Sequence, residues 1–214
     1  MYLLHGFYTQ NTLKTLYVLE ELGEDYQFQY VDLFKGENRS EDFQKKTPIG
    51  KVPVLEHEGQ FLFESGAICR YLANKAQSPL YPDEAMQRAQ VDQWMDFFSC
   101  HLGRWLSTIF FERIIKTAAN MGETDPATVE EAINFVNQQL RILDNRFEST
   151  DWLANDAFSI ADLFALAYME QVHAIDFALD DYPRVQTWLS RLESLDSTNR
   201  ARAQVQSYIQ SSAA

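Results

Sequence analysis

The chain has 214 residues, 46% of them apolar, which is enough for one large or two small globular domains. Its net charge of −13, with no strongly basic patch, argues against a nucleic-acid-binding surface. No apolar run approaches the ~20 residues that span a bilayer, and the start MYLLHGF lacks a basic segment and a cleavage site. We therefore expect a cytoplasmic protein that binds neither nucleic acid nor membrane.

The first 77 residues predict short strands that alternate with helices, because apolar runs and period-two alternation give way to helical periodicity. In chain order, the expected elements are a strand at 2–4, a helix at 12–22 ended by Gly23, a strand at 26–30, a short helix at 41–45, a hairpin of strands 52–56 and 60–63 around Glu58-Gly59, and a helix at 65–76. This β-α-β-α-β-β-α order predicts an α/β domain of thioredoxin type over residues 1–77.

Residues 78–83, with prolines at 79 and 82, predict a linker because proline breaks helices. The rest of the chain has helical periodicity, with expected helices at 84–119 (long or kinked), 126–147, 160–176, 183–195 and 199–209. We expect an all-helical bundle domain at 84–214. Within it, Ser159 and Asp162 have the spacing of a capping box, which would stabilise the helix that follows.

Two short motifs in the first domain predict chemistry. Pro53 follows Val52 in an apolar strand, although proline cannot donate a ladder hydrogen bond. The polar pair Glu64-Ser65 stands directly between an apolar strand and an apolar helix. Such a junction presents free backbone N–H groups to an anion, and Ser65 is expected to cap the helix.

Together with the two-domain pattern, these motifs resemble the glutathione transferase superfamily over essentially the full length. The resemblance implies that glutathione is a substrate and that the Val52–Pro53 bond is cis, so that Val52 pairs with the cysteinyl backbone of glutathione. It also implies that Ser65 and Glu64 bind the γ-glutamyl end. Asn38, Arg39 and Lys51 lie in the loops that family members use for the glycyl carboxylate.

Chemistry on glutathione needs its thiolate, so hydrogen-bond donors are expected between the first strand and the first helix. Tyr8, Thr9, Asn11 and Thr12 are available there. The spacing Thr9-x-Asn11-x-x-Lys14 resembles the bacterial nu-class enzymes, which implies that Thr9 and Asn11 bond the glutathione sulfur. Tyr8 is the alternative donor, and another interpretation is that these residues only cap the first helix. The nu class is linked to the reduction of glutathione-type disulfides.

The partner substrate is expected between the first loop and the long helix, with Phe98, His101 and Trp105 as wall residues beside Phe97 and Arg104. Cys69 and Cys100 have no metal-binding spacing, so we expect reduced, largely buried thiols and no metal.

The function implied by the resemblance is that of a cytoplasmic homodimeric glutathione transferase. It would stabilise the glutathione thiolate for attack on a small hydrophobic electrophile or on a disulfide. The alternative is a non-catalytic binding or regulatory module with the same fold.

Overall fold

The computed structural model describes residues 1–212, with side chains to residue 206, and consists of two compact units. Unit 1 comprises Met1–Tyr81 and the chain from Ser194 onward, whereas unit 2 comprises Pro82–Glu193. The sequence instead predicts that all residues from 84 onward form the second domain. The difference arises because the last helix, α11 (Asp196–Ser212), packs against α1 (Gln10–Leu22) of unit 1.

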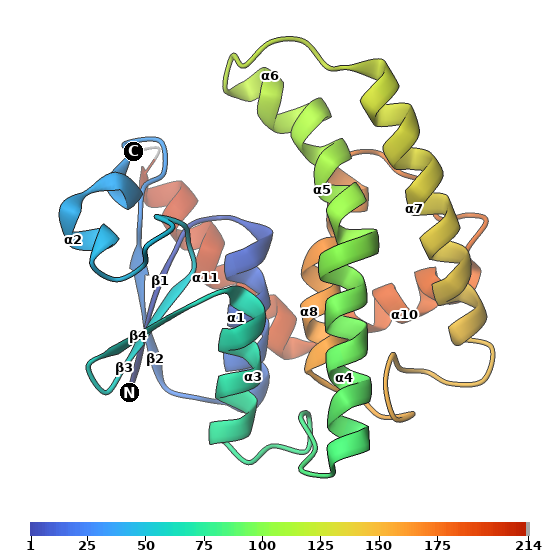
Figure 1. Cartoon of the computed structure of the whole chain (residues 1–214), viewed down its shortest axis with the longest axis horizontal. Coiled ribbons are helices and arrows are strands. Elements are labelled where there is room, and N and C mark those ends of the chain that lie inside the picture. Colours follow the sequence, from blue (N-terminus) through green and yellow to red (C-terminus); the bar gives the residue numbers. More distant parts are fainter. Residues whose placement is uncertain (213–214) are drawn as a thin grey trace. The chain divides into compact units, whose positions relative to one another are not determined.

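A four-stranded sheet in the order β2-β1-β3-β4 forms the centre of unit 1. Strand β1 runs parallel to β2 and antiparallel to β3, and β3 forms a hairpin with β4. Helices α1 and α3 lie together on one side of the sheet (Figure 1). The strands and remaining elements are β1 (Tyr2–Gly6), β2 (Tyr26–Tyr30), η1 (Glu37–Arg39), α2 (Glu41–Gln44), β3 (Val54–His57), β4 (Gln60–Phe63) and α3 (Ser65–Lys75). The predicted thioredoxin-like fold is confirmed.

Local sequence signals account for the ends of α1 and of the hairpin. Thr9 caps α1, and Gly23 ends it in the left-handed region at φ 66°. Glu58 and Gly59 both have positive φ, as a two-residue hairpin turn requires. The predicted strand at 52–56 begins only at Val54, because Pro53 has no N–H to donate.

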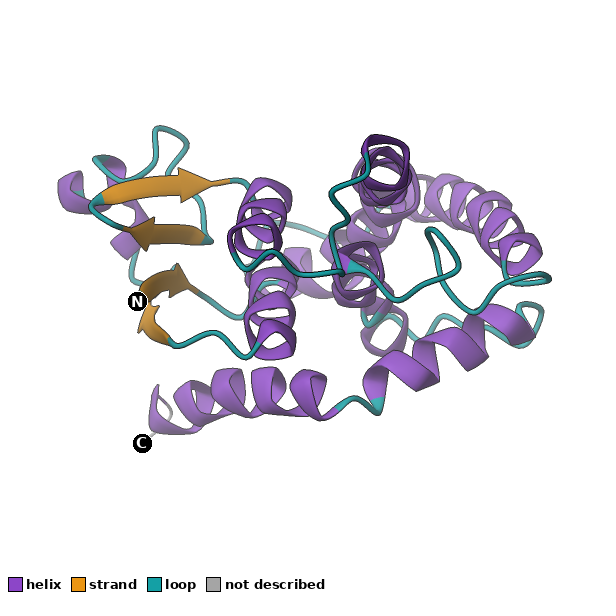
Figure 2. Ribbon diagram, turned by 90° about the horizontal axis from the view of Figure 1, so that it is seen from below, coloured by secondary structure: helices purple, strands orange, loops and turns teal. Residues whose placement is uncertain are grey.

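Unit 2 consists of helices and connecting loops (Figure 2). The predicted helix at 84–119 is a continuous helical path that contains π-helical turns at Phe98–Leu102 and Phe111–Ile115. The α-helices of unit 2 are α4 (Ala85–Phe97), α5 (Gly103–Phe110), α6 (Lys116–Ala118), α7 (Pro126–Arg146), α8 (Ile160–Met169), α9 (Gln171–Ala174) and α10 (Pro183–Glu193). The predicted all-helical bundle is thus confirmed for this part of the chain.

The predicted capping box at the start of α8 is present and fully buried. The Asp162 carboxylate accepts hydrogen bonds from the Ser159 N–H at 3.0 Å, the Leu153 N–H at 3.1 Å and the Trp188 indole at 3.0 Å. Ser159 in turn accepts from the Ala161 N–H at 3.3 Å. Burial raises the pKa of Asp162 to about 6, against these donors, which favour the charged form. The box therefore ties the start of α8 to α10 inside unit 2.

Candidate functional site: a hollow at two strand-to-helix junctions

A hollow of about 50 Å³ lies in unit 1 where the start of α1, the segment before β3 and the start of α3 meet. Its position explains how residues from distant parts of the sequence converge on one site. The residues that line it are Asn11, Ile49, Lys51, Val52, Pro53, Glu64 and Ser65. Six of these seven are candidate site residues from the sequence. Ile49 was missed, because an apolar residue in a polar loop carries no chemical signal of binding.

The Val52–Pro53 peptide bond is cis, as the family resemblance implies. Both residues are buried and also line the hollow. Val52 packs into an apolar cluster with Phe7, Phe43 and Val54. The side chain of Val52 therefore anchors this segment of the hollow's lining in the core of unit 1.

The start of α3 differs from the expectation that Ser65 is its N-cap. Glu64 occupies the cap position, at φ 69° and ψ 110°, and Ser65 is the first residue of the helix. Glu64 makes no side-chain cap hydrogen bond with the described residues. A positive φ is costly for a residue other than glycine and is typical of functional sites. This helix N-terminus therefore presents its N–H groups and positive dipole end to the hollow rather than to a cap.

The start of α1 is capped, by contrast, through a chain of hydroxyl groups. The Phe7 N–H donates to Thr12 Oγ1 at 3.3 Å, and Thr12 Oγ1 lies 3.2 Å from Thr9 Oγ1. Thr9 Oγ1 also accepts from the Thr12 N–H at 3.3 Å. If the Thr12 hydroxyl donates along this chain, the proton of the Thr9 hydroxyl is available to a ligand.

Asn11, in the first turn of α1, lines the hollow itself. Its Oδ1 accepts a hydrogen bond from Lys14 Nζ, one turn further along α1, at 2.8 Å. Lys14 is only 1% exposed. Burial lowers the pKa of Lys14 well below its usual value, while Cys69 and Glu64 oppose that shift.

The third first-loop candidate, Tyr8, has a buried hydroxyl with no hydrogen-bond partner among the described residues. Its ring lies 4.9 Å from that of Phe7 and 5.4 Å from that of Tyr30, between ring centres. A buried hydroxyl without a partner is uncommon in native proteins. Tyr8 thus remains an alternative donor, although it does not line the hollow.

The three residues expected at the glycyl end have different surroundings. Lys51 is exposed at the edge of the hollow. Asn38 Nδ2 donates to the Gly50 carbonyl at 2.8 Å and so holds the loop that precedes Lys51. Arg39 is exposed in η1. Neither Asn38 nor Arg39 lines the hollow, so their contact with a ligand stays a prediction.

Phe98 was expected as a wall of the second substrate site, but it is fully buried in the core of unit 2. Its ring stacks near Tyr168, at 6.3 Å between centres, and lies 6.4 Å from that of Trp188. His101 is exposed in the π-helical turn. Trp105 stacks on Phe135 at 4.4 Å. Phe98 is therefore a core residue, whereas the roles of His101 and Trp105 stay predictions.

The two cysteines have different environments, and neither is in a disulfide. Cys69 is buried on α3, where burial raises the pKa of its thiol to about 12 and makes it unreactive. Cys100 is exposed, contrary to the expectation that both thiols are buried. The described residues contain no group of three or more His, Cys, Asp and Glu side chains that could hold a metal ion. None of the helices in the described part of the chain is long and apolar enough to span a membrane.

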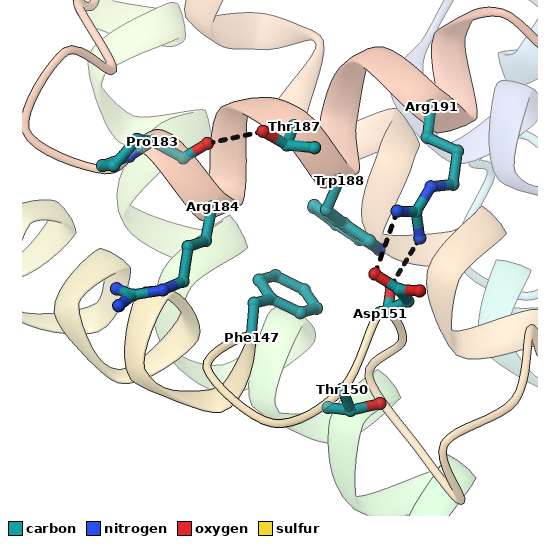
Figure 3. Close-up of a pocket in the computed structure, with 8 residues that line it drawn as sticks. All are labelled: Phe147, Thr150, Asp151, Pro183, Arg184, Thr187, Trp188 and Arg191. Atoms are coloured by element: carbon teal, nitrogen blue, oxygen red, sulfur yellow. Dashed lines mark hydrogen bonds and ion pairs between the residues drawn. The ribbon is translucent and has the colours of Figure 1, made fainter.

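A larger hollow, of about 230 Å³, lies in unit 2 between α10 and the chain that follows α7 (Figure 3). Arg191 in this hollow is bonded to the Asp151 carboxylate at 3.0 Å, and Arg184 is bonded to Asp144 at 2.7 Å. Trp188 directs its indole N–H to the buried Asp162. This hollow is larger than the one in unit 1. Its polar groups are bonded to other side chains of unit 2, however, so they are less available to a ligand.

The sheet with a cis-proline before β3, the open start of α3 and the all-helical unit 2 agree with the glutathione transferase class that the sequence motifs resemble. Residues 1–74 match the family model for the glutathione S-transferase N-terminal domain, and residues 101–196 match the model for its C-terminal domain. The chain is 32% identical over 193 residues to the probable glutathione S-transferase GSTF2 of Oryza sativa subsp. japonica, with 89% of this chain and 90% of the rice protein covered.

Solved structures agree with this match. Glutathione S-transferase I from maize, in complex with an atrazine glutathione conjugate, is 29% identical with a TM-score of 0.89, over 96% of this chain and 98% of the maize chain. A glutathione S-transferase from Pseudomonas fluorescens is 31% identical with a TM-score of 0.82, over 92% of this chain and 96% of that chain. This chain belongs to the glutathione S-transferase family, and its function is that of a glutathione transferase.

Proposed function

We propose that this glutathione transferase binds glutathione over the hollow of unit 1, which admits part of the tripeptide, and stabilises its thiolate with donors from the start of α1. The observation that supports this most directly is the convergence of Asn11, the cis Val52–Pro53 segment and the Glu64-Ser65 junction around one hollow. These segments are more than 50 residues apart at their extremes in the sequence, from Asn11 to Ser65, and their polar residues line the same hollow.

Each end of the tripeptide has a chemically matched group in this proposal. The γ-glutamyl carboxylate binds the Ser65 hydroxyl and the N-terminus of α3, where the helix dipole favours an anion. The Glu64 carboxylate binds the ligand's ammonium. The Val52 backbone pairs with the cysteinyl residue, and the Lys51 ammonium, with Asn38 and Arg39, attracts the glycyl carboxylate.

The reaction requires that the glutathione thiol ionise near neutral pH. A free thiol has a pKa of about 8.5, so a decrease of about 2 units needs about 2.7 kcal/mol of preferential stabilisation of the thiolate. A charge-assisted hydrogen bond supplies about 1.5–3 kcal/mol, and the N-terminus of α1 adds to it. The Thr9 hydroxyl and the Asn11 amide are the proposed donors, with Tyr8 as the alternative. The enzyme itself forms no covalent bond in this step.

We infer from the Thr9-x-Asn11-x-x-Lys14 motif that the chain uses a nu-class mode of thiol activation. The thiolate would attack a small hydrophobic electrophile or the sulfur of a glutathione-type disulfide. In the second case a new S–S bond forms while the old one breaks, and the leaving sulfur departs as a thiolate. A cytoplasmic homodimer that needs no metal is part of the same proposal.

Titration with glutathione tests the proposal in two steps. Calorimetry measures binding, and ultraviolet absorption of the thiolate across pH measures the pKa of the bound thiol. We expect binding and a thiol pKa well below that of free glutathione. Absence of binding would refute the proposed site, and binding without an acidified thiol would favour the non-catalytic binding module. Turnover of a model aryl halide and of a mixed disulfide then distinguishes the two substrate classes.

A further inference from the structure

Lys14 is a buried lysine bonded to Asn11, a residue that lines the hollow of unit 1. It lies on the first half of α1 with 1% of its surface exposed, and its Nζ lies 2.8 Å from Asn11 Oδ1. Lysine is almost never fully buried unless its amine is bonded. A helix that needed only an apolar core would have an aliphatic residue at this position. The buried amine of Lys14 therefore calls for a role beyond packing.

The chemistry of the two groups determines how the Asn11 amide is oriented. Lys14 Nζ donates its hydrogen bond to Asn11 Oδ1, which an amine can do whether it is charged or neutral, so the amide oxygen is the atom of Asn11 that faces Lys14. The NH₂ group of the same planar amide then points away from Lys14. Because Asn11 lines the hollow, this NH₂ group is the part of the side chain that can donate to a ligand there.

The same contact also makes the amide a better donor. A hydrogen bond donated to the carbonyl oxygen polarises the amide, and chains of hydrogen bonds strengthen one another in a low-dielectric interior. Cys69 on α3 and Glu64 at its N-cap are titratable groups that interact with Lys14. Cys69 is a neutral thiol at physiological pH, because burial raises its pKa to about 12.

We propose that Lys14 is a positioning residue for thiol activation, which holds the Asn11 amide with its NH₂ group toward the glutathione sulfur. This inference rests on the proposed role of Asn11 as a thiolate donor. Lys14 does not contact the sulfur itself. Its effect passes through the Asn11 amide, which can adopt either of its two flipped orientations once the amine is removed.

The test measures the pKa of the bound glutathione thiol in Lys14→Met, Asn11→Ala and the double variant. Lys14→Met keeps the buried volume and removes the donor. We expect it to raise the thiol pKa by about one unit, which is about tenfold less thiolate well below that pKa, with little change in the affinity for glutathione. Asn11→Ala should raise the pKa at least as much, and the double variant should equal Asn11→Ala alone.

Two further variants serve as controls. Lys14→Gln keeps an N–H donor without the charge and should recover part of the effect, and it also serves if Lys14→Met does not fold. Leu16→Met changes a fully buried residue of the same helix and should leave the thiol pKa unchanged.

The possible contrary results are separable. An unchanged thiol pKa in both Lys14 variants, beside a raised pKa in Asn11→Ala, would overturn the positioning role while the role of Asn11 stands. An equal shift from Lys14→Met in the presence and absence of Asn11 would also overturn it. If Asn11→Ala itself had no effect, the thiolate role of Asn11 would be wrong, and with it the inference about Lys14.

Discussion

The starts of α3 and α8 both have a serine at a strand- or loop-to-helix junction, yet they are built for different purposes. At α8, Ser159 occupies the cap, and Asp162 completes a buried capping box. At α3, the cap is Glu64 with a positive φ and without a side-chain cap bond, and Ser65 is the first helical residue beside a hollow. A helix start whose N–H groups are satisfied internally stabilises the fold, whereas one left open is available to bind an anion.

The largest expected effect is a loss of stability at the start of α8, where the capping box satisfies the helix N–H groups internally. Asp162→Ala removes a carboxylate that accepts from three backbone or side-chain N–H groups, those of Leu153, Ser159 and Trp188, and leaves these buried donors without partners. We expect a loss of at least about 3 kcal/mol in the free energy of unfolding. Denaturant unfolding measures it, and a loss below about 1 kcal/mol would show that the box is not structural.

The next largest effect is the pH dependence of the unfolding free energy that Asp162 contributes at the start of α8. Burial raises the pKa of Asp162 from 3.8 to about 6, so the folded protein holds a proton there that the unfolded chain has already released. The unfolded state binds fewer protons in this range, so the contribution of Asp162 to stability is fully present below about pH 4 and falls as pH rises through about 6.

The decrease in the unfolding free energy should be up to about 3 kcal/mol. It is measured as the difference between wild type and Asp162→Asn, which has no titrating group at this position. A difference that is constant from pH 4 to pH 7, or one that grows with pH, would contradict the raised pKa.

The start of α1 combines the two roles that are separate at α3 and α8, because the Thr9 hydroxyl is both the helix cap and a proposed donor to the thiolate. Thr9→Ala therefore tests both roles in one variant. Loss of the cap should cost about 1 kcal/mol of stability, and loss of the donor should also raise the pKa of the bound glutathione thiol. Thr9→Ser is the matched control and should restore both properties. A variant that loses stability but keeps the thiol pKa would assign the sulfur bond to Asn11 or to Tyr8 alone.

The sequence predicted the order of elements, the hairpin, the capping box of α8 and the position of the polar junction before α3, because these depend on local residues. The sequence predicted the N-cap of α3 at Ser65, one residue after its actual position at Glu64, because a glutamate does not indicate a positive φ. It also assigned the last helix to the second domain, since periodicity predicts a helix but not the surface against which it packs.

The substrate-wall residues were harder to predict for a related reason. Aromatic side chains at helical spacing have the same pattern in a core and in a pocket wall, and Phe98 proved to be core. The π-helical turn that begins at Phe98 also changes which face of the helix the following residues occupy. Lys14 could be recognised only as part of a motif, because its bond to Asn11 depends on the folded helix.

The central claim is that the start of α3 serves binding while the start of α8 serves stability. It is tested most directly by measuring both the glutathione dissociation constant and the unfolding free energy for Ser65→Ala and Ser159→Ala. We predict that Ser65→Ala raises the dissociation constant about tenfold or more, with little change in stability. We predict that Ser159→Ala lowers stability by about 1 kcal/mol or more and leaves binding unchanged. Equal loss of both properties in the two variants, or unchanged binding in Ser65→Ala, would contradict the account.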